Sequence, residues 1–88
     1  MLKVRGVAGE LRHGYRVVAQ LGRWTLTKGR VEAQPVSVNA FELEQANSVS
    51  LRLTISNKYW VWTDVEVVNQ GTPLVVRVNG APTVRDAQ

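Results

Sequence analysis

The sequence contains no cysteine and only one histidine, His13, among its 88 residues. Without cysteine, neither a disulfide framework nor a thiolate site for a metal ion is available. A catalytic triad on His13 has no carboxylate nearer along the chain than Glu10, and no glycine-rich loop has the spacing of a phosphate-binding motif. We therefore expect a protein that is not an enzyme and that uses no metal or other cofactor.

Long hydrophobic runs are also missing. No window is long enough to cross a bilayer, and Lys3 and Arg5 lie where a signal peptide needs an apolar segment. We expect one domain over residues 1–88 with no signal peptide, no transmembrane segment and no membrane partner, kept in a reducing cytoplasm or assembled there. Within it we distinguish a glycine-rich basic segment, residues 1–14, and a C-terminal tail, residues 81–88.

The clearest pattern is the strict alternation of polar and apolar residues in 48–56, SVSLRLTIS. A period of two is typical of a β-strand with one face in a core. Residues 59–68, YWVWTDVEVV, follow after Asn57-Lys58. The two segments predict a hairpin, closed by a two-residue loop at Asn57-Lys58, that carries two of the three tryptophans.

Strict pairing from that loop creates a conflict further along the hairpin. It sets Leu51 opposite Asp64 and Val49 opposite Glu66, so that two carboxylates share a buried face with two aliphatic side chains at high cost.

One extra residue removes the conflict. A β-bulge at Thr63-Asp64 sets Leu51 against Val65 and Val49 against Val67, and it turns both carboxylates outward. The sequence therefore predicts a bulge in this hairpin, with the indoles of Trp60 and Trp62 in the core. The alternative is a hairpin without the bulge, in which the two indoles are solvent-facing stacking platforms.

A second hairpin is predicted around Lys28-Gly29. With a two-residue loop, Leu26 faces Val31 and Trp24 faces Ala33, so that apolar residues meet at each apolar position. Glycine supplies the positive φ that such a turn needs. Pro35 then either ends this strand or places it at a sheet edge.

The remaining segments are shorter. Alternation predicts strands at 2–5, 15–21 and 74–78, whereas glycines make residues 6–14 mostly loop. Residues 36–47 are either extended or contain up to two helical turns behind a capping box at 39–42.

Together these segments predict an all-β domain of about six short strands. We expect a small antiparallel barrel or sandwich built from hairpins, and at this length a partly open barrel. The expected core residues are those on the inward faces of the two hairpins: Trp24, Leu26, Val49, Leu51, Leu53, Ile55, Trp60, Trp62, Val65 and Val67.

The net charge of +4 is unevenly distributed along the chain. Residues 1–30 hold seven of the eleven basic residues and one of the seven acidic residues, whereas residues 31–70 hold five acidic and two basic residues. A polarised surface of this kind favours an acidic partner, either a protein surface or a nucleic acid. The candidate contact residues are the cations of this region and two tyrosines: Arg12, Arg16, Arg23, Lys28, Arg30, Tyr15 and Tyr59.

Three short strings resemble small β-rich proteins of tailed bacteriophages, including virion accessory and decoration proteins. They are GRWTL at 22–26, YWVW at 59–62 and VRVNGAP at 76–82. The resemblance implies a structural protein that binds neighbouring subunits of an assembly, in the virion or the host cytoplasm. Two alternatives stay open: a basic β-barrel that binds single-stranded nucleic acid, and a phage protein that inhibits a host factor.

Overall fold

In the computed structural model, which describes residues 3–46 and 48–86, the chain forms eight strands and one short helix. Their bounds are β1 Val4–Gly6, β2 Gly9–His13, β3 Arg16–Thr27, β4 Arg30–Val38, α1 Ala40–Gln45, β5 Val49–Ile55, β6 Lys58–Asn69, β7 Leu74–Arg77 and β8 Thr83–Asp86.

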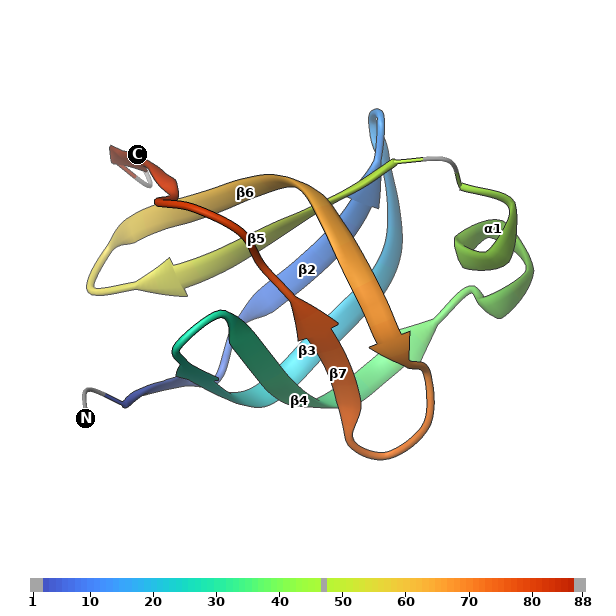
Figure 1. Ribbon diagram of the computed structural model, residues 1–88, viewed down its shortest axis with the longest axis horizontal. Helices are drawn as coiled ribbons and strands as arrows, with labels where there is room; N and C mark the ends of the chain where they lie inside the picture. The colour runs from blue at the N-terminus through green and yellow to red at the C-terminus, as the bar shows by residue number, and fades with distance from the viewer. Residues whose placement is uncertain (1–2, 47, 87–88) are drawn as a thin grey trace.

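Six of these strands close into an antiparallel barrel in the order β3-β2-β5-β6-β7-β4, with β4 returning to β3 (Figure 1). The other two lie outside this ring, β1 against β3 and β8 against β6. The predicted all-β antiparallel barrel is confirmed, but the expected partial opening is wrong. The barrel closes because β7 pairs along both of its edges, with β4 and with β6.

The β3–β4 hairpin has the predicted register. Trp24 pairs with Ala33 and Leu26 with Val31, and Gly29 has a φ of 72° in the turn. Pro35 lies inside β4 and does not end it. β7 pairs only with residues 30–33 of β4, so β7 does not extend alongside Pro35. Proline, which has no N–H donor, therefore removes no hydrogen bond between β4 and β7.

The β5–β6 hairpin forms, but its predicted loop is wrong by one residue. The turn residues are Ser56 and Asn57, with φ values of 51° and 64°; a tight hairpin turn with two positive φ angles favours asparagine. The register moves by two, so that Leu53 pairs with Trp60 and not with Trp62. A shift of two keeps each side chain on its face, and both tryptophans still point inward.

The predicted bulge is present in β6. Leu51 pairs with Trp62 and Val49 pairs with Val65, which leaves one extra residue on β6. The partners predicted from the bulge, Val65 for Leu51 and Val67 for Val49, are therefore wrong, because the turn lies one residue earlier. Asp64 is exposed with a φ of 55°, and the Ser48 hydroxyl donates to its Oδ1 at 2.5 Å.

This bulge makes a stability prediction. We expect Asp64→Val to lower the free energy of unfolding by about 1–3 kcal/mol, because a β-branched residue is strained at positive φ. Asp64→Gly should stay within about 1 kcal/mol of the wild type, since glycine adopts this conformation freely. Urea unfolding followed by circular dichroism measures both, and Thr63→Val, an exposed neighbour without positive φ, is the matched control. Equal losses for the two valine variants would contradict this account.

The glycine-rich segment 6–14, expected to be mostly loop, contains the barrel strand β2, which pairs with both β3 and β5. Here the glycines allow close packing. A Cβ atom on Gly6 would lie 2.2 Å from Cζ2 of Trp24, and one on Gly9 would lie 2.9 Å from Cδ2 of Leu53. Gly6 and Gly9 therefore make room for core side chains against the backbone.

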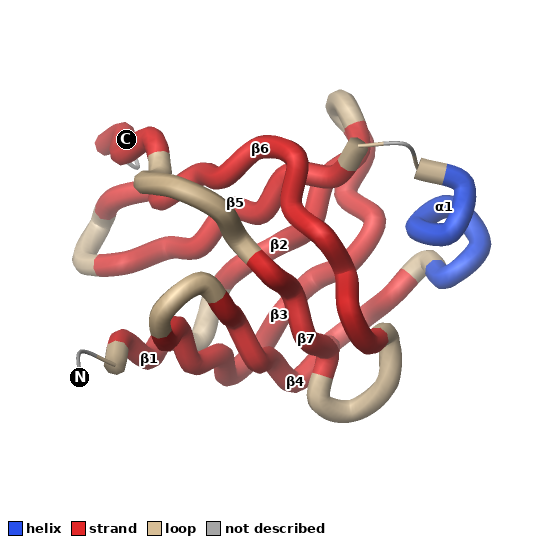
Figure 2. Tube along the Cα trace, in the orientation of Figure 1, coloured by secondary structure: helices blue, strands red, loops and turns tan. Residues whose placement is uncertain are grey.

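The ambiguous segment 36–47 is extended at its start and helical after it: residues 36–38 belong to β4, α1 follows at Ala40–Gln45, and residue 47 lies outside the described residues. Asn39 caps α1, and its side-chain oxygen accepts from the Glu42 N–H at 3.1 Å. Leu43 inserts into the core with 5% of its surface exposed, so that α1 covers one end of the barrel. Both described ends of the chain lie at the other end (Figure 2).

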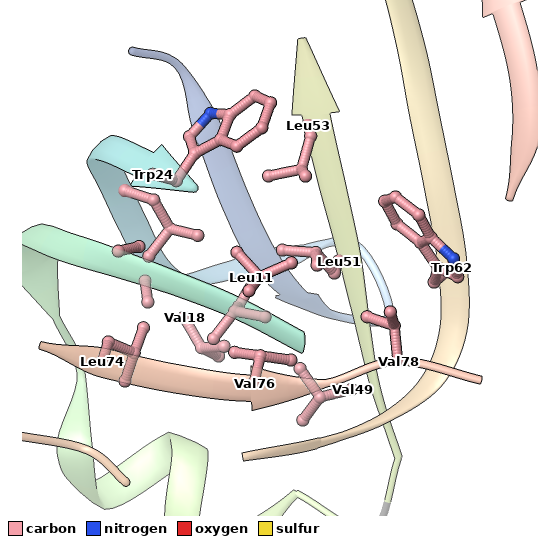
Figure 3. Close-up of a cluster of buried hydrophobic side chains, with 14 of the residues drawn as sticks. Leu11, Val18, Trp24, Val49, Leu51, Leu53, Trp62, Leu74, Val76 and Val78 are labelled. Atoms are coloured by element: carbon pink, nitrogen blue, oxygen red, sulfur yellow. The ribbon is translucent and has the colours of Figure 1, made fainter. Parts of the chain in front are cut away.

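The core fills the barrel interior (Figure 3). Of the ten residues expected there, five are buried, namely Trp24, Val49, Leu51, Leu53 and Trp62, and five are half-buried and packed against them, namely Leu26, Ile55, Trp60, Val65 and Val67. Further buried residues come from β2, from β7 and from the first part of β3, and include Leu11, Leu74, Val76 and Val18. In Figure 3 the indoles of Trp24 and Trp62 lie at separate ends of the cluster.

Candidate functional site

A groove of about 390 Å³ crosses the outer face of the sheet formed by β2, β5, β6 and β8. We call it the arginine–tyrosine groove. Its lining residues are Arg12, Gly14, Ser50, Arg52, Tyr59, Val61, Arg85 and Asp86.

Strand register brings these side chains to one face. Because Trp60 and Trp62 point into the barrel, the alternate residues Tyr59 and Val61 point outward. Val61 pairs with Arg52 on β5, and Tyr59 pairs with Arg85 on β8. Directly paired residues share a face of the sheet, so both arginines lie beside the outward residues of β6.

Glu10 holds two of the arginines in place. It lies opposite Arg52 across β2 and β5, and Arg52 Nη2 donates to Glu10 Oε1. Glu10 Oε2 is 3.2 Å from Arg12 Nε. That contact lacks hydrogen-bond geometry, and the buried Arg12 Nε has no hydrogen-bond partner. One half-buried carboxylate thus orients two guanidinium groups, each of which has further N–H donors.

Tyr59 provides the aromatic surface of the groove. The guanidinium carbon of Arg52 lies over its ring, 4.2 Å from the centroid. A planar guanidinium stacks on an aromatic face through cation–π attraction. Arg52 and Tyr59 are therefore in cation–π contact in the groove.

The structure brings only two of the seven sequence-predicted contact residues into this groove, Arg12 and Tyr59. Two others form ion pairs elsewhere: Arg16 with Glu42 at 2.7 Å and Arg30 with Glu32 at 3.0 Å. The last three lie at separate exposed places: Tyr15 in the β2–β3 turn, Arg23 on β3 and Lys28 in the β3–β4 turn. They do not form one continuous basic track.

Among the residues of the site that sequence reasoning missed, three charged ones matter most for its chemistry: Glu10, Arg52 and Arg85. Glu10 and Arg52 are 42 positions apart and meet only through the pairing of β2 with β5. Arg85 belongs to the expected tail, residues 81–88, of which Thr83–Asp86 form β8 and residues 87–88 lie outside the described residues. The one available signal was that Arg52 occupies an outward position in the alternating segment 48–56.

Three general features complete the description of this chain. Over residues 3–46 and 48–86, no three histidine, cysteine or carboxylate side chains gather as a metal site would require. In the same part of the chain, no helix is long and apolar enough to cross a membrane. Comparison with protein-family models, curated proteins and solved structures found no match to this chain.

Proposed function

We propose that this protein is a non-enzymatic binding protein and that its arginine–tyrosine groove holds single-stranded nucleic acid. The observation that carries the proposal is the convergence of Arg12, Arg52 and Arg85, from three different strands, around the outward ring of Tyr59. Single strands are bound where cations follow the phosphates and flat side chains stack the bases.

The charge of the groove supports an anionic ligand. Its three arginines outnumber the carboxylates of Asp86 and Glu10, so a net positive charge remains. Glu10 lowers this charge but fixes the two guanidinium groups before a ligand arrives, which reduces the entropy lost on binding. Bases then stack on the Arg52–Tyr59 pair, since aromatic rings and guanidinium planes both accept a stacked base.

A second candidate is the structural role implied by the resemblance to phage virion proteins, with neighbouring subunits or a host factor as partner. In the described part of the chain, β1 and β8 pair along one side only, and an open strand edge accepts an added strand. Phe41 and Val36 are also 75% and 69% exposed. These features support docking of another protein, but they come from four separate elements, β1, β4, α1 and β8, whereas the groove residues line one common pocket.

The test is a titration with labelled oligothymidylate about 12 nucleotides long, within the ~4–16 nucleotides that one small barrel covers, at about 50 and about 200 mM salt. We expect Tyr59→Ala to weaken binding about 5–150-fold, the equivalent of ~1–3 kcal/mol for one stacked base, and Tyr59→Phe to keep most of the affinity. Arg85→Ala should weaken binding more than Arg23→Ala, which removes the same charge from an exposed position outside the groove.

The controls separate the groove from general attraction of a basic protein. Equal losses for Arg85→Ala and Arg23→Ala, or an unchanged affinity for Tyr59→Ala, would show that charge alone attracts the oligonucleotide and would reject the proposal. Failure to bind at the lower salt, together with sedimentation as an oligomer, would favour the assembly role.

A further inference from the structure

A second hollow, of about 680 Å³, is lined by residues of the β3–β4 turn and its neighbours, and this turn lies at the end of the barrel opposite α1 (Figure 1). We call this hollow the indole pocket. It lies between β6, the β3–β4 turn and the segment that follows β7, and its principal wall residues are Leu26, Lys28, Trp60, Trp62, Val78 and Pro82. Its volume is within the range of small-molecule sites, roughly 300–1,000 Å³.

The walls of the indole pocket are joined by two hydrogen bonds. The Val78 N–H donates to the Gly29 carbonyl at 3.0 Å, which ties the segment after β7 to the β3–β4 turn. Trp62 Nε1 donates to the Gly80 carbonyl at 3.3 Å, which ties the same segment to β6. The pocket is therefore formed before any ligand binds, as small-molecule sites usually are.

Two indoles give the pocket its chemistry. The rings of Trp60 and Trp62 lie with centroids 6.4 Å apart and tilted by 52°, and leucine, valine and proline side chains surround them. Trp62 is nearly buried, whereas Trp60 is half-buried. Such a surface favours a hydrocarbon chain or a ring over a polar group.

The charge at the rim has one sign. Among the described residues that line the pocket, Lys28 is the single ionisable side chain. A cationic ligand would meet this ammonium group and find no carboxylate in the lining, whereas an anion would gain an ion pair.

We propose that the indole pocket binds a fatty carboxylate, with its chain against Trp60 and Trp62 and its carboxylate on Lys28. The site is separate from the arginine–tyrosine groove because alternate residues of β6 face opposite sides: Trp60 and Trp62 point inward, and Tyr59 and Val61 point outward. The inference therefore stands apart from the nucleic-acid proposal.

The test uses dodecanoate, dodecanol and dodecyltrimethylammonium, each below its micelle concentration, titrated into the full chain. Tryptophan emission and calorimetry report binding. We expect dodecanoate to bind saturably with one site per chain, and at least about tenfold more tightly than the other two probes. Lys28→Glu should weaken dodecanoate binding at least about tenfold and strengthen binding of the cationic probe.

Arg23→Glu is the matched control, because it makes the same change of charge at an exposed position outside the pocket and should leave dodecanoate binding within about twofold. Lack of saturable binding would overturn the proposal. Equal affinity for the three probes would also overturn it, since the pocket would then be a general apolar surface suited to a side chain of a partner protein. Equal losses of dodecanoate affinity in Lys28→Glu and Arg23→Glu would also overturn the proposal.

Discussion

Replacement of Trp24 by alanine is expected to lower the free energy of unfolding by about 3–5 kcal/mol. The side chain is 2% exposed and is the largest fully buried one, and its Nε1 donates to the Ala8 carbonyl at 2.8 Å. Its removal leaves a cavity between β1, β2 and β3 and takes the indole donor from that carbonyl. The free energy of unfolding of a small domain is roughly 5–15 kcal/mol in total, so the variant should unfold at a much lower urea concentration than the wild type.

Urea unfolding followed by far-ultraviolet circular dichroism measures this loss. Trp24→Phe separates the cost of the cavity from the cost of the lost hydrogen bond, because phenylalanine keeps most of the apolar volume and lacks the N–H donor. Trp60→Ala is the positional control: it removes the same side chain from a half-buried site at the mouth of the barrel. If Trp60→Ala costs as much as Trp24→Ala, the assignment of the main core to Trp24 is wrong.

The second large effect is expected at Gly6, where Gly6→Ala should destabilise the fold by about 1–3 kcal/mol through overpacking. Gly6 pairs directly with Trp24 across β1 and β3. An added Cβ would lie 2.2 Å from Cζ2 and 2.6 Å from Cε2 of the indole. The ring is buried, so either β1 separates from β3 or the indole leaves its position.

Gly71→Ala is the control for this substitution. Gly71 has no positive φ, and its nearest neighbours to an added Cβ are 3.6 Å away, so its change should stay within about 0.5 kcal/mol. A double-mutant cycle provides the sharper check: the cost of Gly6→Ala should fall in a Trp24→Phe background, because the smaller ring leaves room for the methyl group. If the losses of stability of Gly6→Ala and Trp24→Phe are additive, the strain of the added methyl group does not come from its contact with the indole.

Several features of this fold follow from the sequence alone, because their physical causes are local. Alternation with period two in residues 48–56 requires a strand with one buried face. The pairing of Trp24 with Ala33 follows from a two-residue turn at Lys28-Gly29, which fixes the register of a hairpin. The bulge at Asp64 follows because a regular ladder would bury a carboxylate.

The turn at Ser56-Asn57 shows the limit of local patterns. Loops at 56–57 and 57–58 differ by two in register, and a shift of two leaves each side chain on the same face. The hydrophobic pattern therefore does not distinguish between them. The structure does, through the positive φ angles of Ser56 and Asn57.

Other features were decided only by contacts between distant segments. Gly6 and Gly9 suggested a loop, but an indole and a leucine from other strands need the space beside them, and the segment from Gly9 is a barrel strand. Arg85 joins the groove because β8 pairs with β6, and Glu10 meets Arg52 because β2 pairs with β5.

The sequence by itself therefore determined the all-β class, the register of one hairpin, the bulge and five of the buried core residues, since each depends on neighbours along the chain. Closure of the barrel, the arginine–tyrosine groove and the indole pocket were decided by the tertiary structure alone. Each depends on which strands lie side by side. That strand order is selected by the packing of the whole core and by hydrogen bonding of the strand edges. The spacing of residues along the chain does not encode it.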